Sequence, residues 1–356
     1  MDFPSSKKTP TIQDVARRAR VSTATVSRAL SAPERVSEKT RERVSEAVHW
    51  TGYTMNQAAR SLRLKAARTI VIAFPDIGNP YYSTVLDAVV HETSSRGYGA
   101  LVANRLGEDP NPTRWLRDYF LSSRADGMVL FDGSLDTDEL YGLRSEGGKL
   151  PLVVSFDELP DARLHSVMTD NRSAAARATR HLIELGHRRI AHIQSRSKRP
   201  GVPSERLLGF HEAMASAGLP VPEGFVFPGT FTIESGEAAG RAILALRERP
   251  TAVFAGNDEM AIGMLSVLRA NGVECPRDIS VVGFDDISIA SRYVPPLTTM
   301  RQPREEMGRL ATRTLLDILE SEEQEIEPLH IVLRSELVIR ESARRWGGEP
   351  RAATYA

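Results

Sequence analysis

The stretch TIQDVARRARVSTATVSRAL, residues 11–30, decides the fold of the N-terminal part of the chain. Thr11 can cap a first helix, and Asp14 three residues later completes a capping box. An apolar stripe at helical spacing follows the cap, formed by Ile12, Val15, Ala16 and Ala19. After a break at Arg20, Ser22 can cap a second helix. The stretch therefore predicts two short helices separated by a tight turn.

The second predicted helix carries small and hydroxylic side chains opposite its apolar side. The inward residues are Val26, Ala29 and Leu30, and the outward residues are Thr23, Ala24, Thr25, Ser27 and Arg28. A helix with so little bulk on one side can lie close against another surface, and the DNA major groove admits an α-helix. Arg28 can read guanine with a forked pair of hydrogen bonds. The pattern predicts a helix-turn-helix whose second helix reads DNA.

Two segments carry a resemblance to a known family. DVARRARVSTATVSRAL at 14–30 and GYTMNQAARSL at 52–62, with the rest of the chain from about Thr11 to Arg345, resemble the lactose/purine/galactose repressors of the LacI type. The resemblance implies a ligand-responsive transcriptional repressor that binds a pseudo-palindromic double-stranded DNA operator as a homodimer. Bases would be read by Thr23, Ala24 and Arg28. Phosphates would be held mainly by Gln13, Ser22, Thr25 and Ser27, which position the protein without specifying sequence.

Arg20 departs from the family pattern, because members commonly have Gly or Asn in this turn. If the turn needs a positive φ, an Arg there costs roughly 1–2 kcal/mol. We expect the fold to tolerate that cost.

Charge is divided unevenly along the chain. The 356 residues include 46 Lys and Arg and 46 Asp and Glu, so the formal net charge is zero. Residues 1–67 hold 13 basic and 6 acidic residues, a net of +7, which leaves 33 against 40 in the remainder, a net of −7. A solvated charged surface would explain this difference equally well. A basic head on an acidic body is nevertheless typical of a polyanion-binding module joined to a second function.

The cellular compartment is suggested by what the sequence does not contain. Cys275 is the single cysteine, which excludes an intrachain disulfide. No apolar run approaches the ~20 residues that span a bilayer, and MDFPSSKKTP at the N-terminus lacks the apolar core of a signal peptide. We expect a cytoplasmic protein without a membrane partner. The family resemblance implies a bacterial one, associated with the nucleoid when bound to DNA.

The head is expected to be a small domain. Residues 1–10 are expected to be disordered, and residues 11–55 form the predicted DNA-binding domain. A third helix is predicted from its cap Ser37 to about Trp50. Its inward side chains, which close a three-helix core, are Val44, Ala47 and Val48. So few residues bury little surface, so the head should be only marginally stable alone.

Residues 56–67 allow two interpretations. The segment NQAARSLR at 56–63 is too short to hold a helix in water without tertiary help, so it could be a plain linker. The family resemblance implies instead a hinge helix that forms when two copies pair on DNA. Asn56 would then contact DNA, Ala59 would permit close helix approach, and Leu62 would be an apolar wedge in the minor groove. Met55 departs from the pattern, because many members have Pro before the hinge.

The body, residues 68–345, alternates short Val- and Ile-rich strands with helices. This alternation indicates parallel α/β sheets, and two such rounds predict two lobes. The resemblance implies a periplasmic-binding-protein-like body for ligand binding and dimerisation. The predicted fold class is α/β, with an all-α helix-turn-helix head and a two-lobed body of parallel sheets.

The lobes are expected to be discontinuous in sequence. Lobe 1 would hold residues 68–169 and 297–324, including a helix at 303–320. Lobe 2 would hold residues 170–294 and 328–345, including HIVLRSELVIR at 330–340. The predicted ends of these lobes leave residues 346–356 as a flexible tail. That tail has no heptads that would form a coiled coil.

Ligands of open α/β folds bind beyond the carboxyl ends of the strands. That rule selects the loops at 76–82, 156–158, 256–258 and 283–286. Residues that the resemblance matches to pocket positions of the family are Arg206, Phe231, Asn257 and Asp285. Tyr81 and Tyr82 could stack on a ring. Asp157 is included as well, although the acidic residue of the family usually stands one position earlier, where this chain has Phe156.

Each of these residues also has a purely structural interpretation. The tyrosines could be core residues, Asn257 and Asp285 could be helix caps, and Arg206 could belong to a surface salt bridge. Convergence from separate loops favours a pocket. Arg and Asp together can grip vicinal hydroxyls and an aromatic ring can stack on a sugar, so we expect a carbohydrate effector. An anionic metabolite paired with Arg206 is the alternative.

No catalytic arrangement stands out in the sequence. Dinucleotide, phosphate-loop, nucleophile-elbow and HExxH motifs are missing, and we expect no cofactor. His181, His187 and His192 do not have the spacing of a zinc site, so we expect no metal. The rival hypothesis is a cytoplasmic sugar-binding or sugar-modifying α/β protein without DNA function, and the basic head argues against it.

Overall fold

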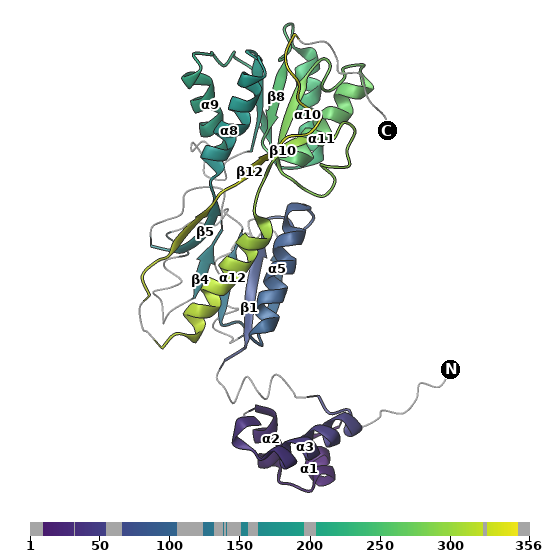
Figure 1. Cartoon of the computed structure of the whole chain (residues 1–356), viewed down its shortest axis with the longest axis vertical. Coiled ribbons are helices and arrows are strands. Elements are labelled where there is room, and N and C mark those ends of the chain that lie inside the picture. Colours follow the sequence, from purple (N-terminus) through teal and green to yellow (C-terminus); the bar gives the residue numbers. More distant parts are fainter. Residues whose placement is uncertain are drawn as a thin grey trace, which may run out of the picture. The chain divides into compact units, whose positions relative to one another are not determined.

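The computed structural model describes residues 10–31, 33–54, 66–104, 124–131, 138, 140, 151–155, 163–195, 204–322 and 326–347 (Figure 1). The chain divides into two compact units, residues 1–67 and residues 68–356. In the described ranges, no helix is both long and apolar enough to cross a membrane.

The N-terminal unit is a small helical domain. It contains α1 (Ile12–Ala19), α2 (Thr23–Ser31), the 3-10 turn η1 (Pro33–Arg35) and α3 (Glu38–Thr51). Its core consists of small and β-branched side chains from all three helices: Val15, Ala16, Ala19, Val26, Ala29, Val44 and Ala47. These are inward positions expected from the helical periodicity, and the other expected inward residues, Ile12, Leu30 and Val48, pack partly buried against the cluster.

The capping chemistry explains where α1 begins. The backbone N–H of Thr11 donates to Asp14 Oδ2 at 2.9 Å, and the two side chains complete the predicted capping box. The helix α1 ends at Arg20, which has φ 52° and ψ 49°. Arg20 is therefore in the left-handed conformation that the family pattern of Gly or Asn implies.

The second unit contains two sheets, whose strands are described in turn. The first sheet has the order β11-β5-β4-β3-β1-β2, and all its pairings are parallel. Its strands are β1 (Thr69–Phe74), β2 (Gly99–Asn104), β3 (Gly127–Leu130), β4 (Leu152–Val154), β5 (His165–Thr169) and β11 (His330–Leu333). The helices α5 (Tyr81–Ser95) and α12 (Arg304–Glu320) lie side by side against it (Figure 1). We call this sheet and its helices lobe 1.

The second sheet has the order β12-β10-β9-β8-β6-β7 and is parallel except for the β10–β12 pair. Its strands are β6 (Ile190–Ser195), β7 (Val226–Gly229), β8 (Ala252–Ala255), β9 (Ser280–Asp285), β10 (Thr298–Arg301) and β12 (Glu336–Val338). Its helices are α8 (Asn171–Glu184), α9 (Glu205–Ser216), α10 (Ile233–Ala245) and α11 (Asp258–Ala270). We call this sheet and its helices lobe 2.

Alternating residues of the central strands fill the cores on the two sides of each sheet. In β8, Val253 and Ala255 pack with α10 and α11, whereas Ala252 and Phe254 pack with α8 and α9. Figure 1 shows these two helix pairs on opposite sides of the second sheet. This period of two, with helices on both faces, is why the strands read as continuous apolar runs. The predicted fold class is confirmed.

Close helix packing in lobe 1 depends on one glycine. A Cβ at Gly308 of α12 would lie 2.6 Å from the carbonyl oxygen of Val85 in α5. Real Cβ atoms do not approach a backbone oxygen this closely, so a larger residue would push the two helices apart. Gly308 therefore lets α12 return to lobe 1 and cover the sheet.

The predicted lobe boundaries were wrong at two strands. The strand β10 pairs with β9 in the second sheet, so residues 298–301 belong to lobe 2 and not to lobe 1. The strand β11 pairs with β5 in the first sheet, so residues 330–333 belong to lobe 1. Only β12 of the segment HIVLRSELVIR joins lobe 2. The physical reason is that the chain passes between the lobes more than once. The edge strands β11 and β12 therefore come from neighbouring residues but pair with different sheets.

The predicted tail also starts too early. The backbone N–H of Trp346 donates to the carbonyl oxygen of Leu185 at 2.8 Å, and its ring lies 5.7 Å from that of His187. Trp346 is thus held on the C-terminal end of α8. Other predictions fall outside the described residues, namely the disordered N-terminus before residue 10, the hinge helix and the candidate pocket residue Asp157.

Candidate functional site

The helix α2 presents the outward side chains that the sequence predicts. Thr23, Ala24 and Arg28 are exposed, and no described residue engages the Arg28 side chain. Ser22 and Thr25 are partly committed to each other, because Ser22 Oγ accepts from the Thr25 backbone N–H at 3.0 Å and lies 2.8 Å from Thr25 Oγ1. The free guanidinium of Arg28 is therefore the strongest candidate for base reading on this helix.

The remaining predicted DNA contacts divide into two groups. Gln13 is exposed on α1, and Ser27 is partly exposed on α2. Asn56, Ala59 and Leu62 lie outside the described residues.

Arg43 supports the turn between α1 and α2, and the sequence analysis missed it. Its guanidinium, on α3, donates to the carbonyl oxygens of Ala19 and Arg20. These carbonyls stand at the C-terminal end of α1, where the helix leaves acceptors without partners. Arg43 thus stabilises the turn that sets the direction of α2 relative to α1. No local sequence pattern predicts this role, because Arg43 lies more than 20 residues from the turn.

In the body, Arg206 is the centre of a buried polar cluster. Arg206 is only 3% exposed and belongs to α9 of lobe 2. Its Nε donates to Asn171 Oδ1 at 2.9 Å, and its Nη1 donates to the Gly256 carbonyl oxygen at 2.6 Å. Nη1 also lies 3.8 Å from Asp285 Oδ1, and the guanidinium lies 3.9 Å from the centre of the Phe284 ring. Arg206 is therefore a buried, fixed cation rather than part of a surface salt bridge.

Gln302 connects that cluster to lobe 1. Its Nε2 donates to Asp285 Oδ1 at 2.6 Å. Its Oε1 accepts from Thr169 Oγ1 at 2.8 Å and from the Tyr81 hydroxyl at 3.3 Å. Thr169 and Tyr81 belong to lobe 1, whereas Asp285 ends β9 of lobe 2. The described contacts thus form a polar bridge between the lobes, at the carboxyl ends of strands from both.

The two predicted tyrosines have different surroundings. Tyr81 is partly exposed and packs against the cores of both lobes, with Arg304 6.0 Å from its ring centre. Tyr82 packs within lobe 1 in tilted and edge-on contacts, its ring centre 4.9 Å from that of Phe74 and 6.2 Å from that of Phe131. Tyr81 therefore lies at the lobe junction, whereas Tyr82 is largely an aromatic core residue.

Asn257 caps α11 and also holds the loop that carries Phe231. Its Oδ1 accepts from the Met260 backbone N–H at 2.9 Å, and its Nδ2 donates to the Phe231 carbonyl oxygen at 3.1 Å. Phe231 has φ 64°, a left-handed conformation that a bulky residue seldom adopts. Its ring centre lies 5.5 Å from the Arg206 guanidinium. Asn257 thus places a half-buried aromatic ring beside the buried cation.

Asp285 and Asp286 point to different partners. Both have positive φ, 116° and 55°, so the loop after β9 is strained where the polar cluster forms. Asp286 accepts from Arg340 Nη2 at 2.6 Å and from Arg301 Nε at 2.7 Å. These ion pairs hold Asp286 in place, and Asp285 is left to face Arg206 and Gln302.

Two further acidic side chains surround this cluster. Asp258 is buried, accepts from Thr299 Oγ1 at 2.6 Å and from the Ile287 N–H at 2.9 Å, and has its pKa raised by burial and by Asp285. Burial, with the charges of Asp285, Asp76 and Glu234, raises the pKa of Glu259 to about 7. Carboxyl groups are therefore gathered beside Asp285, where burial and mutual repulsion oppose the ionisation of Asp258 and Glu259. In the described ranges, no group of three or more His, Cys, Asp or Glu could hold a metal ion.

Comparison with known proteins assigns the chain to a family. Residues 11–56 match the bacterial regulatory proteins of the lacI family, and residues 179–343 match the periplasmic binding protein-like domain. The transcriptional repressor CytR of Escherichia coli (strain K12) is 35% identical over 334 residues, which cover 94% of this chain and 96% of CytR. The chain belongs to the LacI family.

Two further LacI-family relatives extend this similarity to function and structure. The transcriptional regulator CelR of Thermobifida fusca is 36% identical over 344 residues, covering 94% of this chain and 99% of CelR. A solved CelR–cellobiose complex has a TM-score of 0.69 at 35% identity, covering 94% of this chain and all of that one. The Lac repressor dimer bound to operator and the anti-inducer ONPF has a TM-score of 0.82 at 26% identity, covering 95% and 100%.

As a LacI-family member, this protein is a DNA-binding transcriptional regulator with a ligand-binding body. The predicted family and the predicted regulatory function are confirmed. The sequence analysis selected the loop that contains Asp258 without assigning Asp258 to the pocket, and it did not identify Asn171 and Gln302, which complete the polar cluster. Asn171 begins the helix α8 after β5, but β5 is not an apolar run like the strand before Asn257. Gln302 also stands between a strand and a helix, β10 and α12, but β10 itself was not predicted from the sequence.

Proposed function

We propose that this protein is a homodimeric repressor whose affinity for its DNA operator is controlled by a carbohydrate bound between the lobes. The observation that carries the proposal is the bridge from Arg206 through Asp285 and Gln302 to Thr169 and Tyr81. A ligand that inserts among these groups would exchange contacts with residues of both lobes. The relative energy of lobe arrangements would then depend on the ligand, which is what coupling to a distant site requires.

Carbohydrate is the ligand class that these groups suit best. Arg206 and Asp285 offer fixed donors and acceptors for neighbouring hydroxyls, and Phe231 and Tyr81 offer ring faces. A solved structure of the relative CelR is a complex with cellobiose, which supports the same class here. Asn257 acts as a positioning residue in this proposal because its side chain holds the Phe231 loop. Tyr82 supports Tyr81 from within lobe 1, and Asp157 is a further candidate contact from the sequence.

The head provides the operator contacts. We assign base reading to Thr23, Ala24 and Arg28, and phosphate contacts to Gln13, Ser22, Thr25 and Ser27. The hinge assignments of Asn56, Ala59 and Leu62 rest on sequence alone, with Leu62 as the wedge in the minor groove. In this proposal the protein is not an enzyme, needs no cofactor, and works in the cytoplasm, associated with the nucleoid when bound to DNA.

Two linked measurements test the proposal on the full-length protein. A thermal-shift screen of mono- and disaccharides, with cellobiose and ribose among the probes, should reveal a sugar that raises the Tm, because a ligand of the folded state stabilises it. An operator selected from a randomised DNA library should then bind with an affinity that the same sugar changes at least about fivefold, the lower range of allosteric coupling. A sugar that stabilises the protein without changing operator affinity would contradict the proposal.

A further inference from the structure

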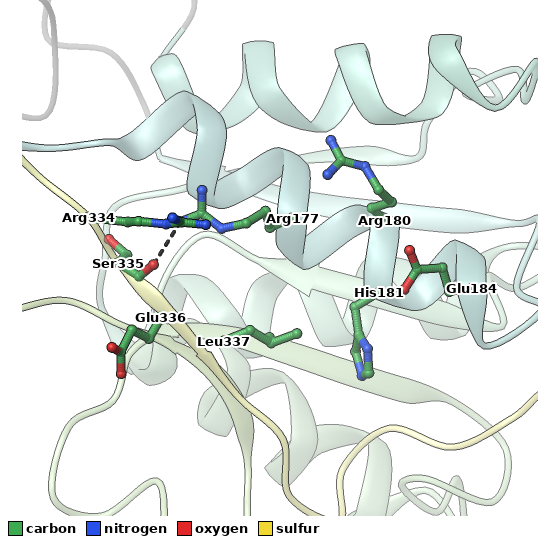
Figure 2. Close-up of a pocket in the computed structure, with 8 residues that line it drawn as sticks. All are labelled: Arg177, Arg180, His181, Glu184, Arg334, Ser335, Glu336 and Leu337. Carbon is green, nitrogen blue, oxygen red and sulfur yellow. Dashed lines mark hydrogen bonds between the residues drawn. The ribbon is translucent and has the colours of Figure 1, made fainter.

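A polar pocket lies on lobe 2, and none of its lining residues belongs to the bridge between Arg206 and Gln302. It has a volume of about 530 Å³ and lies between α8 and the segment 334–337, which leads from β11 to β12. Figure 2 shows the lining side chains, which are Arg177, Arg180, His181, Glu184, Arg334, Ser335, Glu336 and Leu337. Because water occupies roughly 30 Å³ per molecule in the liquid, the pocket has room for a small organic molecule. Its charge pattern indicates what that molecule would be.

Arg177 forms the fixed floor of this pocket. Its Nη2 donates to Asp170 Oδ2 at 2.9 Å and to the Ser335 carbonyl oxygen at 2.8 Å, and its Nη1 donates to Ser173 Oγ at 2.8 Å. The backbone N–H of Ser335 donates back to Asp170 Oδ1 at 2.8 Å. These bonds fix the position of Ser335 and make the floor rigid before any ligand arrives.

Two other arginines line the pocket without such commitments. Arg180 and Arg334 are exposed, and within the described part of the chain neither guanidinium has an ion-pair or hydrogen-bond partner. Figure 2 shows them on either side of Arg177, one from α8 and one from the crossing segment. The carboxylate of Glu336 is turned away from all three guanidinium groups in the same view. Positive charge is therefore available beside Arg177, from Arg334 on the crossing segment and from Arg180 further along α8.

Buried polar atoms in the same pocket lack partners. Ser335 is only 1% exposed, and its hydroxyl oxygen has no hydrogen-bond partner among the described residues. The buried Nε2 of His181 is in the same situation. A buried hydroxyl or ring nitrogen without a partner costs free energy, so such groups call for an explanation. A bound acceptor between the arginines would satisfy the Ser335 hydroxyl.

We propose that this pocket binds a small phosphate-bearing anion, held by Arg180, Arg334 and the Ser335 hydroxyl above the fixed guanidinium of Arg177. Guanidinium groups bind phosphate oxygens in pairs, with planar geometry and full charge at any physiological pH. Leu337 offers an apolar contact for the body of the molecule, and Glu184 at the far end can accept from its hydroxyls. The pocket would therefore favour a phosphate ester over free phosphate.

The location gives such a ligand a consequence for the fold. Asp170 directly precedes α8 where the chain leaves lobe 1, and Ser335 lies where it crosses again, between β11 and β12. The Asp170 N–H also donates to the Leu333 carbonyl oxygen at 2.9 Å. An anion on Arg180 and Arg334 would thus add contacts between α8 and a segment that joins the lobes. It would not compete with a ligand at Arg206.

Titration calorimetry on the full-length protein tests this site with inorganic phosphate, glycerol 3-phosphate and glycerol at constant ionic strength. We expect saturable binding of both phosphates and none of glycerol. Tighter binding of glycerol 3-phosphate would identify an ester as the source, and equal binding would identify free phosphate. Arg180→Ala and Arg334→Ala should each raise the Kd about tenfold or more, because each removes a charge-assisted hydrogen bond.

Two variants make the result specific. Ser335→Ala should raise the Kd severalfold and leave the denaturation midpoint unchanged or higher, because the lost hydroxyl has no partner in the free protein. Arg247→Ala removes an exposed arginine that does not line the pocket, and its Kd should match wild type. The proposal is overturned if phosphate binding does not saturate, or if the Arg180 and Arg334 variants bind as tightly as the Arg247 variant.

Discussion

Gln302 and Asp285 share a hydrogen bond of 2.6 Å between an amide donor and a carboxylate, and both side chains are buried. Asp285 reaches this position from β9 of lobe 2, while the other end of the Gln302 amide accepts from Thr169 and Tyr81 of lobe 1. Both polar atoms of the Gln302 amide are thus hydrogen-bonded: its nitrogen donates to a carboxylate, and its oxygen accepts from hydroxyls. A carboxylate, an amide and hydroxyls in one chain of bonds provide a polar connection between the lobes.

Gln302→Ala should destabilise the body by about 1–3 kcal/mol, because Asp285 and Thr169 would lose a buried hydrogen-bond partner. Urea unfolding followed by circular dichroism measures this change. Gln302→Glu is a second variant that keeps the size of the side chain but sets a carboxylate beside Asp285. It should be less stable at pH 8 than at pH 5, because the two negative charges repel each other when both are ionised. An unchanged midpoint for Gln302→Ala would show that the bridge contributes no stability.

Sequence alone predicts the features that depend on neighbours along the chain. The capping box of Thr11 and Asp14 is local, so it could be recognised from spacing. The strand-end rule selected the loop that carries Asp285, because carboxyl ends of parallel strands meet at one edge, and the family resemblance supplied Arg206. The structure brings these two side chains into one buried cluster. Gln302 could not be found in this way, since Tyr81 and Thr169 are 221 and 133 residues distant.

The misplaced strand β11 has the same explanation. HIVL at 330–333 and ELV at 336–338 are adjacent, short and apolar, yet they join different sheets. Their sequences carry no signal for the sheet to which each belongs. The decision depends on which edge strand, β5 or β10, is free to pair, and that is a property of the assembled lobes.

Arg28→Ala should weaken binding to the operator by about 1–3 kcal/mol, the value of one good base contact. Because Arg28 is exposed and has no described partner, its loss should leave the fold of the head intact. Fluorescence anisotropy over a randomised operator library should show relaxed base preference at one position in each half-site. Arg35→Ala, on the turn after the reading helix, is the matched control and should alter no base preference. Equal selectivity of wild type and Arg28→Ala would remove Arg28 from the base-reading set.

Arg20→Gly should stabilise the head by up to about 1 kcal/mol. Arg20 has φ 52°, where a side chain costs roughly 1–2 kcal/mol, and the greater freedom of unfolded glycine offsets part of the gain. Arg17→Gly, three residues earlier inside α1, should instead destabilise it by about 1 kcal/mol. Thermal unfolding monitored at 222 nm compares the two variants. The same sign for both would mean that the turn conformation contributes no strain.

Glu259 should make the body less stable as the pH rises from about 4.5 to about 7. Burial and the nearby charges of Asp285, Asp76 and Glu234 raise its pKa from 4.5 to about 7, so the native state binds more protons than the unfolded state within that window. Stability should then level off above pH 7. Glu259→Gln should reduce this slope, although Asp258, whose pKa is also raised, will retain part of it.

Urea unfolding at several pH values measures that slope for Glu259→Gln. The exposed Glu223, on the loop before β7, provides the control variant Glu223→Gln, which should keep the wild-type slope. Identical slopes for Glu259→Gln and wild type would assign the pH dependence to other groups.

Asp285→Ala should disconnect the ligand site from the operator site. The substitution removes the carboxylate 3.8 Å from Arg206 and the acceptor of the Gln302 amide, and truncating one side of a buried charge pair typically costs about 2–5 kcal/mol. Ligand affinity should fall accordingly, whereas the separately folded head retains its DNA-reading helix. If the ligand is an inducer, the variant should bind the operator and fail to release it when ligand is added.

If the ligand is instead a corepressor, the same variant should fail to bind the operator tightly at any ligand concentration. Both outcomes follow from one coupling free energy, which is reciprocal between the two binding sites. The measurement is operator affinity with and without the sugar found in the thermal-shift screen, for wild type, Asp285→Ala and Glu223→Ala. Glu223→Ala should respond as wild type does, because Glu223 is exposed and outside the polar cluster. A ligand response in Asp285→Ala as large as that of wild type would mean that the sugar does not act through this cluster.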